Sequence, residues 1–285
     1  MPDKLTAMTL TTQSQQTITS IDQVIEELNH IIEWSMRHNS RIGYFAVLYH
    51  RVTCRIKEGI ERGEFEDGKR MERLDILFAT RYINAWQEWT NHKTPTQSWE
   101  VAFEATKNTS TIILQHMLLG INAHINLDLG IATNETMQQE FCIEGILHDF
   151  DTINSILASL VDEVEKDLSK VSPMIWVVQK FGKGYEDKLA TFSIDIARTG
   201  AWYFGCMLHV AEEDNPLIQT RDQSIAALGQ NLAKPKSKML RSMVWLASLF
   251  ERGKPSEVIE KLRYVVKVAA EKSVEKMDFS YRENE

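Results

Sequence analysis

The sequence predicts an all-α protein: a single-domain bundle of about eight or nine helices with a buried central helix. Apolar residues recur with a spacing of about 3.6 residues in almost every segment that is longer than a turn. The chain has 13 glycines and 6 prolines in 285 residues, too few for a sandwich or barrel that turns roughly every 8–12 residues. Hydrophobic residues make up 43% and charged residues 25%, as in a soluble globular domain and unlike a disordered chain.

The expected helices follow one another along the chain, each bounded by a capping or breaking signal. Ser20 and Gln23 form a capping-box pattern that opens the first helix. Asn134 reads as the start of the fifth helix, and the fourth helix is expected to kink near residues 108–110. The expected ranges are 20–38, 40–62, 69–91, 97–129, 134–168, 185–212, 217–232, 236–251 and 256–273.

The predicted domain organisation is one folded unit between two tails. Residues 1–18 are rich in Thr, Ser and Gln and are expected to form a mobile tail, residues 19–275 the all-α domain, and residues 276–285 a charged tail. No segment has the roughly 18 uninterrupted apolar residues of a transmembrane helix, and the N-terminus lacks the apolar core of a signal peptide. We therefore expect a cytoplasmic protein.

Charge and motifs exclude several common functions. The formal net charge is -8 and the pI is about 5.6, so the chain has no strong basic field for nucleic-acid binding. The three cysteines are far apart and form no CxxC pattern, which argues against a structural zinc finger. The sequence contains no GxGxxG, GxxxxGK[ST], GxSxG or HExxH motif, which excludes the common nucleotide-binding, serine-hydrolase and zincin classes.

Asp75 is a carboxylate in the middle of an aromatic stripe, which it shares with Tyr82 on the expected helix at 69–91. Burying a carboxylate without a partner costs several kcal/mol, on the order of the desolvation penalty of a charge. We therefore expect a partner for Asp75. It could be an arginine such as Arg51 or Arg55, a metal ion, or a set of hydroxyl and amide donors.

The most informative string is LLGINAHINLDLG at residues 118–130. This segment is apolar nearly all round, which identifies it as the central helix. His124 and Asp128 are four residues apart on one face, a spacing that suits either a shared metal ion or a direct hydrogen bond. Gly120 lies one turn earlier on that face and leaves room for a ligand or a closely packed helix.

Several amides and a third aspartate are secondary candidates. Asn122 and Asn126 lie on the opposite side of the central helix and could bridge to neighbouring backbones. Asn154 falls within the apolar stripe of the expected fifth helix, Asp149 flanks that stripe, and His148 projects to the outer side. Because Asp149 is expected only at the margin, its replacement by Ala should destabilise the protein less than Asp128→Ala.

On the expected helix at 185–212, Asp195, Arg198 and Trp202 line one margin of the apolar face. Asp195 and Arg198 have the i, i+3 spacing of a helical ion pair. An arginine beside a tryptophan on an inward margin also suits an anionic ligand group.

Three strings are specific enough to compare with known families: RLDILFATRYINAW, LLGINAHINLDLG and HDFDTIN. They resemble a bacterial domain-of-unknown-function family, numbered 5995. Its signature is an NAHIN-x-DL core, a DF-xx-IN element, and an Arg near a Trp, here Arg198 and Trp202. The resemblance spans roughly residues 20–215 and implies an all-α fold but no activity.

A second, fainter resemblance rests on the spacing of the leucine–glycine pair that precedes His124 and of Asp128. It is similar to the LGxxxHxxxD segment of the zinc-dependent phospholipase C and nuclease group, all-α proteins that bind a cluster of zinc ions. In that group the Asp bridges two metals and further histidines follow. This chain departs from the pattern, with Asn134 in place of a His and Thr152 in place of a Glu.

Two hypotheses follow for the function. In the first, a divalent metal such as zinc or manganese is held by Asp75, His124 and Asp128 and activates water for attack on a phosphoester or lipid-like substrate, while Arg198 holds an anionic substrate group. These four residues would be catalytic. The other pocket residues would be Tyr82, Asn122, Asn126, Asp149, Asn154 and Trp202. In the second, the chain is a non-enzymatic small-molecule-binding or scaffold protein whose buried polar residues are structural.

Overall fold

The computed structural model describes residues 17–140, 142–172, 194–251 and 253–263, and these residues form helices and connecting loops without a strand. The predicted all-α class is therefore confirmed. The labelled elements in this part of the chain are α1 (Ile21–Arg37), α2 (Gly43–Glu61), α3 (Gly68–Thr90), α4 (Gln97–Ala105), α5 (Ile113–Ala123), η1 (His124–Asp128), α6 (Leu129–Met137), η2 (Ile143–Ile146), α7 (Leu147–Val171), α9 (Ile194–His209), α10 (Asp214–Ala233) and α11 (Lys238–Ser248).

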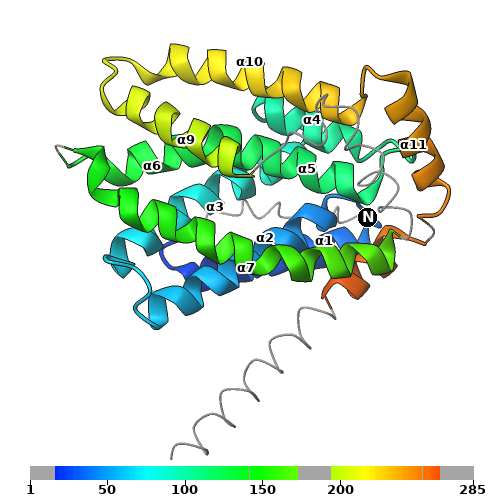
Figure 1. Ribbon diagram of the computed structural model, residues 1–285, viewed down its shortest axis with the longest axis horizontal. Helices are drawn as coiled ribbons and strands as arrows, with labels where there is room; N and C mark the ends of the chain where they lie inside the picture. The colour runs from blue at the N-terminus through cyan, green and yellow to red at the C-terminus, as the bar shows by residue number, and fades with distance from the viewer. Residues whose placement is uncertain (1–16, 141, 173–193, 252, 264–285) are drawn as a thin grey trace, which may run out of the picture.

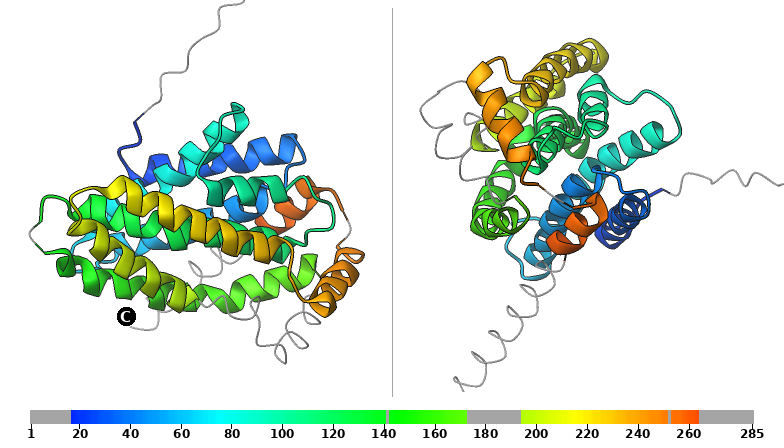
Figure 2. Two further views of the ribbon diagram at one scale, coloured as in Figure 1. Left: turned by 90° about the horizontal axis from the view of Figure 1, so that it is seen from above. Right: turned by 90° about the vertical axis from the view of Figure 1, so that its right-hand side faces the viewer.

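A continuous helical rod formed by α5, η1 and α6 runs through the middle of the bundle (Figure 1). Its first half packs against α2, α4 and α10, and its second half packs against α3 and α9. Figure 2 shows from two further sides that α10 and α1 lie on opposite sides of the rod. The rod is therefore the central helix that the sequence predicts.

The middle of the rod is the π-helical turn η1, in which every residue except Ile125 is buried. Short π-helical turns inside α-helices are often found at functional sites. This turn contains both His124 and Asp128, so it sets the directions of the two most prominent polar side chains of the central helix.

Two glycines allow the rod to touch its neighbours closely. A Cβ atom on Gly120 would lie 2.4 Å from the ring of Phe45 on α2, so this glycine permits close packing of a helix rather than leaving space for a ligand. A Cβ atom on Gly130 would lie 2.7 Å from the carbonyl oxygen of Ala201, which explains the close contact between α6 and α9. That contact brings α9 and its Arg198 to the rod.

The expected helix at 97–129 is wrong as a single kinked element, because α4 ends at Ala105 and α5 begins at Ile113. Polar side chains in the connection compete with the helical backbone: the Thr106 hydroxyl donates to the carbonyl oxygen of Phe103, and the side chain of Asn108 accepts from a nearby backbone N–H. Such local hydrogen bonds favour a turn over a continuing helix.

The expected start of the fifth helix at Asn134 is also wrong. Asn134 is buried inside α6, and the next long helix, α7, begins at Leu147. Asn is a frequent N-cap residue, but here the packing of α6 on α9 outweighs the local preference. Part of the expected tail 1–18, the tail 276–285, the beginning of the expected helix 185–212 and the end of the helix 256–273 lie outside the described residues.

Within the described ranges, no helix is long and apolar enough to cross a membrane.

Candidate functional site

An apolar cavity of about 230 Å³ lies between α2, α3, α7, α9 and the central rod. Most of its walls are aliphatic or aromatic side chains, among them Phe45, Val52, Leu74, Phe78, Ile121 and Leu157. Of the described residues that line it, three besides Tyr49 are ionisable: Asp75 from α3, His124 from η1 and Arg198 from α9. The structure thus brings three of the four residues expected to be catalytic to one cavity.

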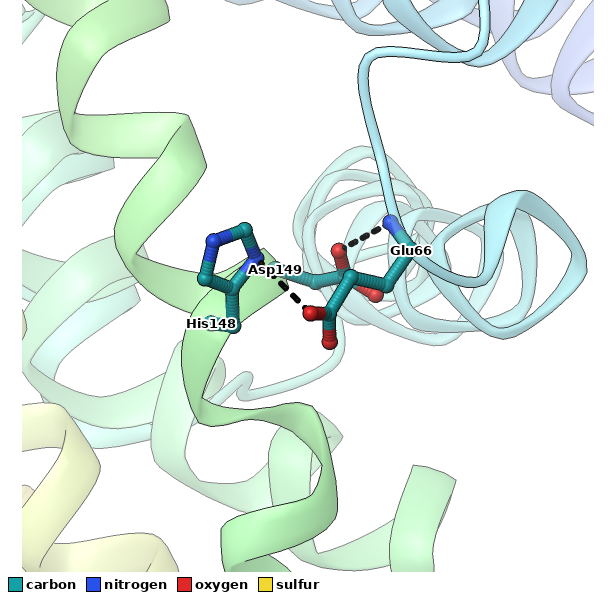
Figure 3. A group of neighbouring side chains, drawn as sticks. All are labelled: Glu66, His148 and Asp149. Carbon is teal, nitrogen blue, oxygen red and sulfur yellow. Dashed lines mark hydrogen bonds and ion pairs between the residues drawn. The ribbon is translucent and has the colours of Figure 1, made fainter.

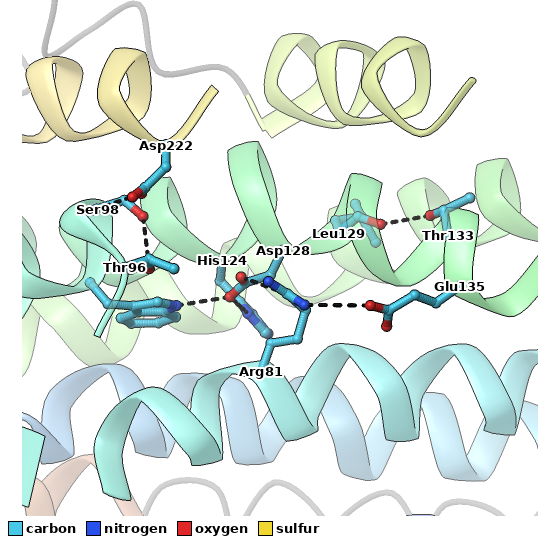
Figure 4. A network of polar contacts seen from close by, with 10 residues as sticks. Arg81, Thr96, Ser98, His124, Asp128, Leu129, Thr133, Glu135 and Asp222 are labelled. Atoms are coloured by element: carbon cyan, nitrogen blue, oxygen red, sulfur yellow. Dashed lines mark hydrogen bonds and ion pairs between the residues drawn. The ribbon is translucent and has the colours of Figure 1, made fainter. Parts of the chain in front are cut away.

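The fourth residue, Asp128, does not line the cavity but contacts the ring of His124 and holds it in place (Figure 4). Asp128 Oδ2 lies 3.2 Å from His124 Nδ1 and accepts a hydrogen bond of 2.8 Å from Trp99 Nε1. Its Oδ1 accepts from Arg81 Nε at 3.0 Å. Asp128 is only 1% exposed, so three donors compensate for the burial of its charge.

His124 is a neutral imidazole with one nitrogen unpartnered. Because a carboxylate only accepts hydrogen bonds, the proton of the ring is on Nδ1 and points to Asp128. Burial lowers the pKa of His124, and the hydrogen bond to Asp128 only partly opposes that shift. The other nitrogen, Nε2, is buried and has no hydrogen-bond partner among the described residues, so its lone pair is available to accept a proton.

Aromatic rings fix the plane of this imidazole. Phe78 stacks on it with ring centroids 3.5 Å apart and an angle of 6° between the planes, and Tyr49 meets it edge-on with centroids 4.4 Å apart. The hydrogen bond at Nδ1 and the rings on two sides together fix the orientation of the imidazole. They therefore also fix the direction in which Nε2 points.

Asp75 is buried without the partner that the sequence led us to expect. The residue is 4% exposed, and neither carboxyl oxygen has a hydrogen-bond partner within the described part of the chain. Arg55, one of the two expected partners, pairs instead with Glu64 at 2.8 Å. Burial raises the pKa of Asp75 from 3.8 to about 7, with a further contribution from the charge of Glu72. A substantial fraction of this carboxyl group is therefore protonated at neutral pH.

Arg198 is a buried cation whose contacts are neutral. It is 3% exposed, and its guanidinium donates to the side-chain oxygen of Asn154 and to the carbonyl oxygen of Phe150, while it lies 4.3 Å from the centroid of the Phe150 ring. The expected ion pair with Asp195 is wrong, since Asp195 is exposed and the two side chains form no ion pair in the described structure. Burial lowers the pKa of Arg198 to about 10, which still leaves it charged at neutral pH.

The ligand atoms of Asp75, His124 and Asp128 do not come together as a group that could share one metal ion. Within the described residues, such a group is formed instead by Glu66, His148 and Asp149 (Figure 3). The metal triad predicted from the sequence is thus not assembled in this conformation.

The group in Figure 3 has a structural explanation. The two oxygens of Asp149 accept from the backbone N–H groups of Glu66 at 2.7 Å and Asp67 at 3.1 Å, and Arg70 lies 3.0 Å away. Asp149 therefore ties the loop before α3 to α7 and has little capacity left for a cation. It is fully buried, so the expectation that it lies only at the margin of the apolar stripe is wrong. His148 is exposed on the outer side, as the sequence predicts.

The remaining expected pocket residues lie away from the cavity walls described above. Asn122 donates to the backbone of α10 at Ile225, 3.0 Å away, and Asn126 donates to Asn122 at 3.1 Å, so both bridge structural elements as the sequence suggested. Tyr82 is fully buried among aromatic rings, and Trp202 packs on the ring of Phe150.

Arg81 and Trp99 are the residues of the site that the sequence did not identify. Both contact Asp128, but one comes from α3 and the other from α4. The available signal was indirect: a buried aspartate requires donors, and Arg81 lies in the string RLDILFATRYINAW. Nothing in the spacing indicates that Trp99 reaches the same carboxylate.

The chain matches a known protein family, but this family has no known activity. No curated protein and no solved structure matches the chain. A model of a family of unknown function, DUF5995, matches residues 21–235, a range that contains every side chain of the cavity. The chain therefore belongs to the DUF5995 family.

Proposed function

We propose that the chain is an enzyme that hydrolyses an ester or phosphoester bond of a lipid-like substrate, with His124 as the general base. One observation carries this proposal: His124 lines an apolar cavity, its Nδ1–H is held by Asp128, and its Nε2 has no hydrogen-bond partner among the described residues. A carboxylate that fixes the tautomer of a histidine and stabilises the imidazolium form is a recurrent feature of hydrolases.

Two groups of the cavity, His124 and Asp75, transfer protons in this reaction. His124 Nε2 removes a proton from water as the water oxygen bonds to the carbonyl carbon or the phosphorus. The bond to the leaving oxygen breaks, and that oxygen receives the proton of Asp75, which is protonated in a large fraction of molecules because burial raises its pKa to about 7. The proton on His124 is returned to Asp75 when the products leave, which restores the starting state.

The metal-dependent form of this hypothesis remains a prediction from the sequence. It requires Asp128 to bind zinc or manganese together with His124 and Asp75, but both Asp128 oxygens accept hydrogen bonds from protein donors. The structure therefore gives more support to hydrolysis without a metal, in which Asp128 positions His124.

The test uses two chromogenic probes, p-nitrophenyl octanoate and p-nitrophenyl phosphate, with the wild-type protein and with His124→Gln. General-base catalysis contributes roughly 100-fold or more, so His124→Gln should lose at least that much activity while His148→Gln, a change of an exposed histidine, should lose none. Activity that survives a chelator supports the metal-free form. Activity that a chelator removes and that zinc or manganese restores supports the metal-dependent form. Equal rates for wild type and His124→Gln on both probes would contradict the proposal.

The second candidate is a non-enzymatic protein that binds a small apolar molecule. The almost wholly apolar wall of the cavity favours it, because such a wall holds hydrocarbon whether or not a reaction follows. Tight binding of a lipid-like probe without turnover of either chromogenic ester would select this candidate. Both candidates keep the cytoplasmic location that the sequence predicts.

A further inference from the structure

We propose that the natural ligand of the cavity is an anionic amphiphile, with a carboxylate headgroup and a medium-length hydrocarbon chain that, in the substrate, carries the ester bond to be hydrolysed. Its headgroup would pair with Arg198 and its chain would lie against the apolar walls toward His124. This inference rests on the proposed function in one respect, namely that the cavity is the ligand site, and it adds the chemical class of the ligand.

Arg198 is a buried charge with no opposite charge among its contacts in the described structure. Arg198 is 3% exposed, and in the described structure it contacts an amide oxygen, a carbonyl oxygen and an aromatic face, none of which carries a negative charge. A buried charge is normally paired with an opposite one. Asp151 and Asp195 influence Arg198 electrostatically but are exposed to solvent. The described residues of the cavity wall therefore offer Arg198 no negative partner, and a bound anion would supply one.

Neither Asp75 nor His124, the other two ionisable groups of the cavity, serves as a negative partner of Arg198. The oxygens of Asp75 have no hydrogen-bond partner among the described side chains, so Arg198 does not bind them. Burial keeps His124 neutral. Among the described residues, the wall of the cavity thus carries one fixed cation, Arg198, and no fixed anion that contacts it.

The kind of anion follows from the donors available. A carboxylate has two oxygens that match a guanidinium group, and it needs few further donors. A phosphate would bring more charged oxygens than Arg198 can satisfy, into walls that are otherwise mostly hydrocarbon. Ile194 lies one helical turn before Arg198, and both line the cavity, as does Leu157 of α7, so an apolar chain attached to the headgroup has hydrocarbon surface to contact.

The experiment compares three ligands of equal chain length and different charge: octanoate, octanol and octylamine. Each is titrated against the wild-type protein by calorimetry and by displacement of the neutral fluorescent probe N-phenylnaphthylamine. One charge-assisted contact in a buried site predicts that octanoate binds roughly tenfold more tightly than octanol or better, and that octylamine binds most weakly.

Variants of Arg198 then test whether this residue causes the preference for octanoate over octanol. Arg198→Gln should reduce the affinity for octanoate to that for octanol, whereas Arg198→Lys should keep part of the difference. Arg221→Gln is the matched control, since Arg221 also lies over an aromatic ring, that of Phe204, but does not line the cavity. Because Arg198 also links α9 to α7, circular dichroism melts and retained binding of the neutral probe must show that each variant is folded.

The outcomes separate this inference from the proposed function. Equal binding of octanoate and octanol to the wild type, or tightest binding of octylamine, would overturn the anionic ligand but leave the cavity as an apolar site. A preference for octanoate that persists in folded Arg198→Gln would also overturn it. If neither the neutral probe nor any of the three ligands binds, the cavity is not the ligand site and the proposed function fails as well.

Discussion

Replacing Asp75 by Asn removes a carboxyl group that the fold buries without a hydrogen-bond partner among the described residues. The side chain keeps its shape but can no longer ionise. The pKa of Asp75 rises on folding from 3.8 to about 7, a change of about three units. At about 1.36 kcal/mol per unit, ionised Asp75 lowers the stability of the folded state by on the order of 4 kcal/mol.

Whether stability rises or falls with pH follows from the number of protons bound by the folded and the unfolded chain. Between the two pKa values, folded Asp75 holds a proton that the unfolded chain has released, so the stability of the wild type falls as the pH rises through this window and levels off above about pH 7. The asparagine variant lacks this dependence. Its stability relative to the wild type should therefore grow by about 1.4 kcal/mol for each pH unit between about pH 5 and pH 7, and then stay constant.

Urea unfolding followed by circular dichroism from about pH 5 to pH 8 measures this difference directly. Other titrating groups, such as the buried His124, contribute to both proteins and cancel in the comparison. Asp195→Asn, a change of an exposed aspartate, serves as the control and should follow the wild type at every pH. Parallel curves for wild type and Asp75→Asn would refute the conclusion that Asp75 is buried and unpartnered.

Three further predictions concern the residues around the cavity. Asp128→Ala and Asp149→Ala should destabilise the protein by similar amounts, about 3–5 kcal/mol, because each leaves several buried donors unpaired; a clearly smaller shift of the urea midpoint for Asp149→Ala would restore the expectation from the sequence. Gly120→Ala should cost about 1–3 kcal/mol in the same assay, because its Cβ would lie 2.4 Å from the ring of Phe45; an unchanged midpoint would disprove this tight packing. Excess zinc or manganese should leave the melting temperature of the wild type unchanged, and a rise that His124→Ala abolishes would instead establish the metal site predicted from the sequence.

The direction in which polar side chains point could largely be predicted from the sequence. A rotation of about 100° per residue places Asp75, His124 and Asp128 inward and His148 outward, and the structure agrees. Burial within one helix depends on local periodicity, which the sequence contains. The partners of these groups depend on how different helices meet, so the contact of Trp99 with Asp128 could not be predicted.

The predicted helix boundaries are wrong where a local sequence signal competes with the packing of helices. Asn134 has the chemistry of an N-cap, but it lies in the middle of α6 because Gly130 allows that helix to approach α9. The π-helical turn that holds His124 also has no sequence signature that we could have used. Arg198 was expected to pair with Asp195 because of their spacing, yet its contacts are with Asn154 and Phe150 of α7.

The most direct test of the central claim is an NMR measurement of the two ring nitrogens of His124. The chain has 8 histidines, so the signals of His124 are identified by their absence from the spectrum of the His124→Gln variant. We expect a neutral ring at pH 7 with its proton on Nδ1, and a resonance of the bare Nε2 that shifts when octanoate is added. A ring that is charged at pH 7, a proton on Nε2, or an Nε2 resonance that does not respond while octanoate binds would contradict the central claim.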